Sequence, residues 1–447
     1  MEPVRSPDGR IVLDVWLANY PFRTYDGRDF LAPMRQFAAQ FEKAHPEYRV
    51  DITGHDFWTM PQKVAAAVES GGTPVLAAYY AGDTQAARDA RAADGAPLFT
   101  PVGKAIGDRT EILGEPVAVR DLVPAVRDFY TYGGELCSVP VTATTLLLYA
   151  NTTLLEAAGI SALPTTWEEL RKACAAVVRG PGGAPHGITW ANDGWVFQQA
   201  VALQGGLLAT PGNGRTGRAT SVDLSSPHLL DWVRWWADLH ADGHYLYTGS
   251  PSDWGGAFGA FAQQRVAFAL DSSKAAEDLV RCGNQAGFDV AVCPMPAADR
   301  SPRAGNPVSG DSLWLAAGLD RATEDGALAF TQFLINPRNA AEWHRAHGFV
   351  PVTEPAFALL EEEGWFAGRP HQRVATEQLR ASDGSVAALG PLVGDLAGIG
   401  EVMTGAMDDV LLRGADPVER FARASARAQE VLDDWLRMHG EPAAAPA

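Results

Sequence analysis

Short apolar runs alternate along the chain with segments whose apolar residues recur at helical spacing. The run IVLDVWLANY at residues 11–20 has the pattern of a β-strand, whereas Phe37, Phe41 and Ala44 fall on one face of a helix. Strand-like and helix-like segments continue to alternate through the rest of the chain. Strands that alternate with helices are typical of sheets covered by helices, so the pattern predicts an α/β fold.

The length of the chain predicts more than one domain. At 447 residues it exceeds the roughly 250–300 residues at which a single hydrophobic core stops growing. No Gly/Ser-rich stretch or run of charge separates an N-terminal from a C-terminal half. We therefore expect two lobes that are built from interleaved segments of the chain.

The stretch FLINPRNAAEWHRAHGFVPVT, at residues 333–353, predicts a hinge. Pro337 cannot donate into a helical ladder, so one helix is expected to end there and Asn336 to cap the next. Gly348 permits the backbone turn that ends the second helix. The aromatic ring of Phe349 is then expected on a short connector.

Five stretches share their pattern with one known family. They are 333–353, the strand 11–20 with the helix 31–50, the pair at 63–83, the strand and helix at 140–160 with TTWEELRKACAAV at 165–177, and GDSLWLAAG at 310–318. The most specific is the fourth, with its Y-x-N turn, Ala-Gly-Ile and Thr-Trp-x-Glu-Leu. Together they resemble the extracellular solute-binding proteins of ABC importers, in the sugar-binding cluster that includes glycerol-3-phosphate and maltose binders.

The resemblance implies a two-lobed periplasmic-binding-protein fold of type II, with three crossovers between the lobes and a ligand cleft between them. The first lobe is expected to comprise residues 10–142 and 310–348, and the second residues 146–307 and 350–440. The ends, 1–9 and 441–447, are expected to be disordered. The crossovers are predicted near residues 142–145, 308–311 and 349–352.

Composition excludes several classes of protein. The formal net charge is −18, from 36 basic and 54 acidic residues, which disfavours nucleic-acid binding because phosphate backbones need clustered Lys and Arg. No run of about 20 apolar residues is long enough to span a bilayer.

Four cysteines lack the spacing of a metal site. Cys137, Cys174, Cys282 and Cys293 form no C-x-x-C pair and no Cys/His set, so zinc is not expected. Cys282 and Cys293 could pair in an oxidising compartment, but small buried thiols are the favoured reading.

The first residues, MEPVRSPDGR, contain neither an apolar export segment nor a lipobox cysteine. We expect an extracellular, membrane-anchored lipoprotein whose export signal is absent from this sequence, because the leader resembles the tether that follows a lipidated cysteine. A cytoplasmic protein recruited to another task is the alternative.

Ligands of this kind of fold bind outside the carboxyl ends of the strands. The chain places aromatic and hydrogen-bonding side chains at the predicted strand ends and crossovers. As ligand-binding residues we predict Trp16, Asn19, Asp56, Trp58, Tyr80, Asp83, Thr144, Asp193, Trp195, Asp271, Ser273, Gly310, Asp311, Phe349 and Asp395. Any one of the aspartates could instead cap a helix, and any ring could cover a core.

Rings beside carboxylates suit a carbohydrate, because its C–H faces stack on rings while its hydroxyls donate to Asp oxygens. Glycerol-3-phosphate members of the family hold the phosphate with a loop arginine and a tyrosine of the closing segment. The resemblance puts Leu392 or Gly400 at the first position and Phe349 at the second, so both donors are missing. Only Lys274 and Arg345 lie near the predicted site in sequence. A phosphate is therefore disfavoured, and a neutral sugar, oligosaccharide or amino sugar is predicted.

Three functional classes stay open. The first is a monomeric import receptor that needs no cofactor or metal and docks on the permease subunits of an ABC transporter. The second is a cytoplasmic enzyme recruited from the same fold to act on a sugar-like metabolite, although no G-x-S-x-G, P-loop or H-E-x-x-H motif is present. The third is a cytoplasmic sensor or carrier. A glycerophosphodiester or glycerol-3-phosphate binder remains a further alternative for the ligand.

Overall fold

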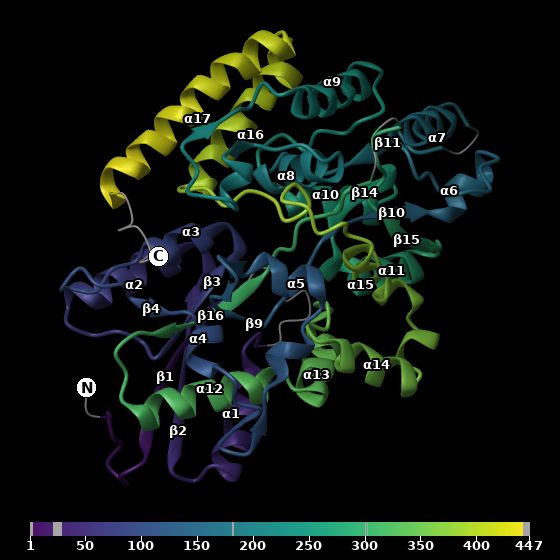
Figure 1. Ribbon diagram of the computed structural model, residues 1–447. Coiled ribbons are helices and arrows are strands. Elements are labelled where there is room, and N and C mark those ends of the chain that lie inside the picture. Colours follow the sequence, from purple (N-terminus) through teal and green to yellow (C-terminus); the bar gives the residue numbers. More distant parts are fainter. Residues whose placement is uncertain (1–2, 21–28, 181–182, 300, 302, 441–447) are drawn as a thin grey trace. The chain divides into compact units, whose positions relative to one another are not determined.

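The computed structural model describes residues 3–20, 29–180, 183–299, 301 and 303–440 (Figure 1). The described chain folds as two compact units. Unit 1 comprises residues up to 143 together with 309–365, and unit 2 comprises 144–308 together with the residues from 366 onward. The chain therefore passes three times from one unit to the other, with both units built from segments that are distant in sequence.

The third passage lies later in the chain than the predicted crossover at 349–352. Residues 350–365 belong to unit 1 because they pair with its other segment. Thr353 forms a β-bridge with Leu122, and the Val123 N–H donates to the Val352 carbonyl at 2.9 Å. The helix that follows packs on its predecessor within the same unit.

Unit 1 contains a six-stranded sheet with the strand order β2-β1-β3-β16-β4, and β9 also pairs with β16. β1 runs parallel to β2 and β3, whereas β16 is antiparallel to β3. The carboxyl ends of β1, β2 and β3 and the start of β16 thus meet at one edge of the sheet. We call this the strand edge of unit 1.

The strands of unit 1 are β1 (Ile11–Asn19), β2 (Tyr48–Asp56), β3 (Leu76–Tyr80), β4 (Phe99–Thr100), β5 (Glu111–Ile112), β6 (Glu115–Pro116), β7 (Thr131–Tyr132), β8 (Glu135–Leu136), β9 (Val139–Pro140) and β16 (Asp311–Ala316). Its helices are α1 (Ala32–Ala44), α2 (Met60–Glu69), α3 (Thr84–Asp89), α4 (Val102–Ile106), α5 (Pro124–Phe129), α12 (Arg321–Ile335), α13 (Pro337–His347) and α14 (Glu354–Glu362). The helix predicted at 31–50 ends at Ala44, before His45-Pro46, and its last residues belong to β2 instead.

Residues 3–9, expected to be disordered, form an ordered turn against the sheet. Arg5 forms a β-bridge with Ile11, and the Val12 N–H donates to the Val4 carbonyl at 2.9 Å. Ser6 is buried and donates to the Arg10 carbonyl at 3.2 Å. The expectation for 3–9 is therefore wrong, while residues 1, 2 and 441–447 lie outside the described chain.

The structure of 333–347 follows its sequence closely. α12 ends at Ile335, and the Asn336 side chain accepts from the Asn339 N–H at 2.9 Å, as an N-cap does. Gly348 adopts a left-handed conformation with φ of 72° and ends α13. These predictions are confirmed.

Unit 2 contains a four-stranded sheet with the order β11-β14-β10-β15. β11 is parallel to β14, while β10 is antiparallel to both β14 and β15. The ends of β11, β14 and β15 and the start of β10 therefore lie at one edge. We call it the strand edge of unit 2.

The strands of unit 2 are β10 (Leu146–Asn151), β11 (His186–Thr189), β12 (Ala209–Thr210), β13 (Ser221–Val222), β14 (Val266–Ser272) and β15 (Val290–Pro294). Its helices are α6 (Thr152–Ala157), α7 (Trp167–Arg179), α8 (Gly194–Leu203), α9 (Pro227–Ala241), α10 (Trp254–Ala262), α11 (Ala276–Ala286), α15 (Val374–Arg380), α16 (Leu396–Arg413) and α17 (Pro417–His439).

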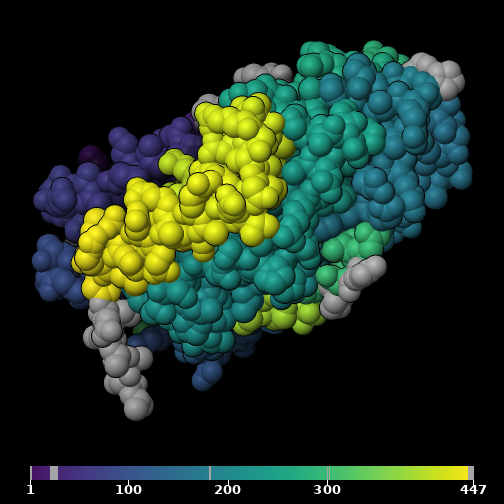
Figure 2. Space-filling view, turned by 90° about the horizontal axis from the view of Figure 1, so that it is seen from above, coloured from purple at the N-terminus to yellow at the C-terminus, as the bar shows by residue number. Residues whose placement is uncertain are grey.

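The core of unit 2 is rich in tryptophan. Trp190, Trp232 and Trp236 have no exposed surface and lie within 5.1–6.0 Å of one another, measured between ring centroids. α17 closes this core from outside, since its buried residues recur at helical spacing and its other faces are open. Figure 2 shows the yellow spheres of α16 and α17 at the surface, beside the teal middle of the chain.

Candidate ligand site

The strand edge of unit 1 brings together residues that the sequence predicts for the ligand. Asn19 and Asp56 are register partners at the ends of β1 and β2, and Tyr80, which ends β3, is paired with Asp311, which starts β16. These four residues therefore lie along one edge. Trp16 lies inside β1 rather than after it, with its ring 4.5 Å from the His55 ring, so its predicted position past the strand is wrong.

An aromatic cluster of Tyr20, Phe57, Trp58 and Tyr80 covers this edge. Tyr20 stacks on Phe57 at 4.6 Å between centroids, and Phe57 lies 4.1 Å from Trp58 and 5.5 Å from Tyr80. Tyr20 and Phe57 are buried, whereas Trp58 is 56% exposed. An indole held by buried rings and open on its other side is suited to stacking against a ligand.

The buried layer of the cluster is held by hydroxyl groups. The Tyr20 hydroxyl donates to Asp311 Oδ2 at 2.5 Å, and the Thr142 hydroxyl reaches the same oxygen at 3.1 Å. Ser309 donates to the Tyr80 hydroxyl at 2.8 Å. Burial raises the pKa of Asp311 to about 6, against the lowering effect of the bonds from Tyr20 and Thr142.

Gly310 is required by its backbone and its surroundings. Its φ of 129° is strained for residues with a side chain, and a Cβ at this position would lie 2.4 Å from the Thr142 carbonyl oxygen. The Gly310 carbonyl accepts from the Ala81 N–H at 2.7 Å. Gly310 thus serves the close approach of two segments of unit 1.

Phe349 and Asp83 are the other two predicted ligand residues of unit 1. Phe349 is 3% exposed, and its ring lies parallel to that of Trp343 at 6.1 Å, inside unit 1. Phe349 therefore lies on the connector after α13, as expected, but packing buries its ring. Asp83 stands at the N-cap of α3 but makes no capping bond with its side chain.

The strand edge of unit 2 holds Thr144, Ser273 and Asp271. The Ser273 N–H donates to the Thr145 carbonyl at 2.8 Å, and the Thr145 N–H donates to Ser273 Oγ at 3.2 Å. Thr144 and Ser273 are buried. Asp271 lies within β14, is also buried and accepts from the Ser272 N–H at 2.6 Å.

A second group forms where β11 leads into α8. Asp193 caps α8 by accepting from the Trp195 N–H at 2.9 Å, and its other oxygen accepts from the Ser252 hydroxyl at 2.8 Å and the Trp254 indole at 3.3 Å. Trp195 and Trp254 lie 5.8 Å apart and both are partly buried against the core. Trp195 Nε1 is buried and has no partner among the described residues.

Sequence reasoning missed the polar residues next to this group. Asp408 on α16 accepts from the Asn192 amide at 2.8 Å and from the Tyr247 hydroxyl at 2.6 Å. Burial raises the pKa of Tyr247, and the bond to Asp408 adds to the rise. Asn192 directly precedes Asp193 and could have been found by the strand-end rule, whereas nothing in the sequence ties Tyr247 or Asp408 to it. Tyr20 was missed although it directly follows β1.

Three predicted aspartates act as caps, the alternative that the sequence left open. Asp56 accepts from the Trp58 N–H at 3.0 Å, and Asp395 accepts from the Gly398 N–H at 3.0 Å, as Asp193 does for Trp195. Each carboxylate satisfies a helix N-terminus that would otherwise present free N–H groups.

The two residues that the resemblance offers for the position of the phosphate-binding arginine, Leu392 and Gly400, are both buried in unit 2. Leu392 is 3% exposed. Gly400 packs against α8, since a Cβ at Gly194 would lie 2.7 Å from the Gly400 Cα. Neither position offers a cationic donor.

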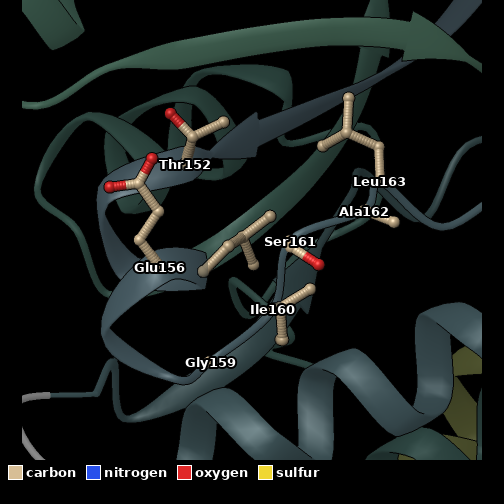
Figure 3. Close-up of a pocket in the computed structure, with 8 residues that line it drawn as sticks. Thr152, Glu156, Gly159, Ile160, Ser161, Ala162 and Leu163 are labelled. Carbon is tan, nitrogen blue, oxygen red and sulfur yellow. The ribbon is translucent and has the colours of Figure 1, made fainter.

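A separate hollow of about 440 Å³ lies beside α6, lined by Thr152, Leu155 and Glu156 of that helix and by residues 159–163 of the loop that follows (Figure 3). None of the predicted ligand residues lines it. Each of the two strand edges is therefore taken, by itself, as a candidate ligand surface.

The described residues contain no group of three His, Cys, Asp or Glu side chains arranged to hold a metal ion. All four cysteines are free thiols. Of the helices in the described part of the chain, none combines the length and apolar character needed to cross a membrane.

The chain matches the family model of bacterial extracellular solute-binding proteins over residues 36–367, which is more than half of its length, and it belongs to that family. Members serve ABC importers as receptors for small molecules outside the cytoplasm, so permease subunits are its partners.

Its relatives agree with this assignment. The sn-glycerol-3-phosphate-binding periplasmic protein UgpB of Yersinia enterocolitica is 25% identical over 405 residues, covering 89% of each chain. The cyclic alpha-maltosyl-1,6-maltose binding protein of Arthrobacter globiformis has a TM-score of 0.75 at 20% identity, covering 95% of this chain and 100% of that one. UgpB of Mycobacterium tuberculosis, solved with glycerophosphocholine, has a TM-score of 0.71 at 22% identity, covering 95% and 99%.

These structures share the fold of the two-lobed periplasmic binding proteins, so the predicted fold class is confirmed. The relatives are binding proteins rather than enzymes.

Proposed function

We propose that this solute-binding protein captures a carbohydrate, either a neutral sugar, an oligosaccharide or an amino sugar, and delivers it to the permease of an ABC importer. The observation that carries the proposal is the aromatic cluster of unit 1, in which buried rings support an indole that is 56% exposed. Such a surface stacks on the C–H face of a sugar ring, a contact worth about 0.5–1.5 kcal/mol beyond the area that it buries.

Unit 2, taken by itself, offers polar groups that suit the hydroxyls of the same class of ligand. Asp193, Asp408 and Tyr247, all partly exposed, offer carboxylate and phenol groups beside the rings of Trp195 and Trp254. Sugar hydroxyls donate to carboxylates in charge-assisted hydrogen bonds, which are roughly twice as strong as neutral ones.

A phosphate ligand is less well supported by the same residues. Phosphates bind to helix N-termini through free backbone N–H groups, or to Arg and Lys. The helix N-termini that follow the predicted ligand residues Asp56, Asp193 and Asp395 already carry the carboxylate of their own cap. A phosphate there would face a negative charge.

A glycerophosphodiester is the second candidate, favoured by the relatives named for glycerol-3-phosphate and by the M. tuberculosis protein solved with glycerophosphocholine. The trimethylammonium group of such a ligand would be attracted to the face of Trp58, because a ring face attracts cations.

A thermal-shift panel tests the proposal. The panel holds maltotetraose, ribitol, tagatose, glucosamine, glycerophosphocholine and sn-glycerol 3-phosphate, each in phosphate-free buffer. A ligand at 100 times its dissociation constant stabilises the folded protein by about 2.7 kcal/mol. We expect a shift with a sugar and none with sn-glycerol 3-phosphate. A shift with the phosphate esters alone would contradict the carbohydrate assignment.

Product analysis separates a receptor from an enzyme built on the same fold. A sugar that is recovered unchanged after prolonged incubation with the protein supports the receptor. Steady turnover that depends on Asp193 or Asp311 would contradict it.

A further inference from the structure

The buried carboxyl group of Asp311 has hydrogen-bond donors on only one of its two oxygens among the described residues. It is 2% exposed, and its Oδ2 accepts from the Tyr20 and Thr142 hydroxyls at 2.5 and 3.1 Å. Its Oδ1 is buried and has no hydrogen-bond partner among the described residues. A buried carboxylate oxygen without a donor costs free energy. The ionised form of Asp311 is therefore stabilised only through Oδ2, by the Tyr20 and Thr142 hydroxyls.

The groups that face Asp311 are phenols and a hydroxyl. Tyr20 follows β1, Thr142 lies on the segment after β9, and Tyr130 follows α5 with its own pKa raised by burial and next by the charge of Asp311. Tyr80 faces Tyr130 from β3. Among the described residues, no cationic side chain contributes to the pKa of Asp311.

Tyr20 connects this carboxyl to the candidate ligand surface. Its hydroxyl bonds to Asp311, its ring stacks on Phe57, and Phe57 lies against the exposed ring of Trp58. Movement of Tyr20 would therefore shift the rings that support Trp58.

We propose that Asp311 is a positioning residue of the ligand site, which fixes the Tyr20 ring against Phe57, the ring that contacts Trp58, and holds it more firmly when ionised than when protonated. The inference rests on the proposed function in one respect only, because it assumes that Trp58 contacts the ligand. An O–H···O⁻ bond is roughly twice as strong as its neutral counterpart, so ionisation tightens the bond from Tyr20. Ligand binding should then strengthen as the pH rises through the range in which Asp311 ionises.

A double-mutant cycle without ligand tests the coupling directly. Tyr20→Phe keeps the ring and removes its donor, and Asp311→Asn keeps an acceptor but cannot ionise. From urea unfolding, we expect the effects of the two substitutions on the unfolding constant to be non-additive by about fivefold at pH 7.5 and by less than twofold at pH 5. Additive effects at both pH values would overturn the proposal, as would equal coupling at both.

Asp14→Asn provides a matched control. Asp14 lies on β1 of the same sheet and its pKa is also raised, chiefly by burial. Paired with Tyr20→Phe, it should give additive effects at both pH values. If Asp311→Asn does not fold, Tyr20→Phe alone decides: its destabilisation relative to wild type must grow from pH 5 to pH 7.5, and a constant difference would overturn the proposal.

Calorimetry with maltotetraose tests the effect on the site. We expect the wild-type affinity to rise about fivefold between pH 5 and pH 7.5, and to change less than twofold in Asp311→Asn. An equal rise in both proteins would overturn the link to the site. If maltotetraose and the other sugars of the panel fail to bind wild type at either pH, the carbohydrate assignment fails, while the unfolding cycle still judges the role of Asp311.

Discussion

The two strand edges use the same residue types in opposite ways. In unit 1 the exposed element is a ring, Trp58, and the principal carboxyl, Asp311, is buried beneath the cluster. In unit 2 the carboxylates of Asp193 and Asp408 are partly exposed and satisfied by several donors, while Trp195 packs against the core. Unit 1 is therefore suited to stacking, and unit 2 to directional hydrogen bonding.

The largest expected effect concerns Asp311 and pH. Its pKa is raised from 3.8 to about 6, so the folded protein binds a proton that the unfolded chain releases. The stability from this group is fully present below about pH 3.8 and is lost as the pH rises through about 6. Relative to Asp311→Asn, wild type should lose about 2 kcal/mol of unfolding free energy between pH 4 and pH 7, measured by urea titration. Parallel pH profiles for the two proteins would contradict the prediction.

Trp58→Ala should have the next largest effect, on binding alone. Loss of a stacked, centrally placed indole costs about 2 kcal/mol, or roughly thirtyfold in affinity. The ring is mostly exposed, so the unfolding free energy of the empty protein should change by less than about 0.5 kcal/mol. Calorimetry and urea unfolding of the same preparation measure both quantities. A stability loss as large as that expected for a core tryptophan would show that the ring belongs to the core.

Trp195→Ala is expected to weaken binding less and to destabilise the protein as well. The side chain is partly buried against the core of unit 2, so its removal should cost about 1–2 kcal/mol of stability. Its position on the turn alone predicts a loss of binding without a loss of stability. The structure changes that expectation, because the turn is covered. An unfolding free energy equal to that of wild type would show that Trp195 contributes to binding alone, as its position on the turn predicts.

Asp193 offers the smallest and most local test. Asp193→Ala removes the cap of α8 and should cost about 1 kcal/mol, whereas Asp193→Asn retains a capping oxygen and should cost only a few tenths. Equal losses of stability would mean that the charge, and not the cap, matters there. The same pair, titrated with a sugar that binds wild type, separates the role of Asp193 as a cap from a role as a ligand acceptor.

The sequence predicts many of the strands and helices because the pattern of apolar positions is regular. The placement of Asn19, Asp56 and Tyr80 near strand ends follows from it, although the helix predicted over 31–50 overlaps the start of β2, and Asn336 and Gly348 follow from capping chemistry. The bond between Tyr20 and Asp311 joins residues 291 positions apart, and no local pattern encodes such a contact.

Other misses have a similar cause. Phe349 lies on the connector where the sequence places it, but its burial against Trp343 is tertiary packing that no local pattern encodes. An aspartate before a helix has the same local pattern whether it caps the helix or binds a ligand. Asp56, Asp193 and Asp395 could therefore be located but not assigned.

The most direct test of the account is the calorimetric titration of wild type and Trp58→Ala, in parallel, with the sugar that shifts the panel most and with sn-glycerol 3-phosphate. The account predicts that the sugar binds wild type, that its affinity falls by about thirtyfold in Trp58→Ala, and that the phosphate ester gives no heat of binding to either protein. Tight binding of sn-glycerol 3-phosphate to both proteins, with no sugar bound, would contradict it.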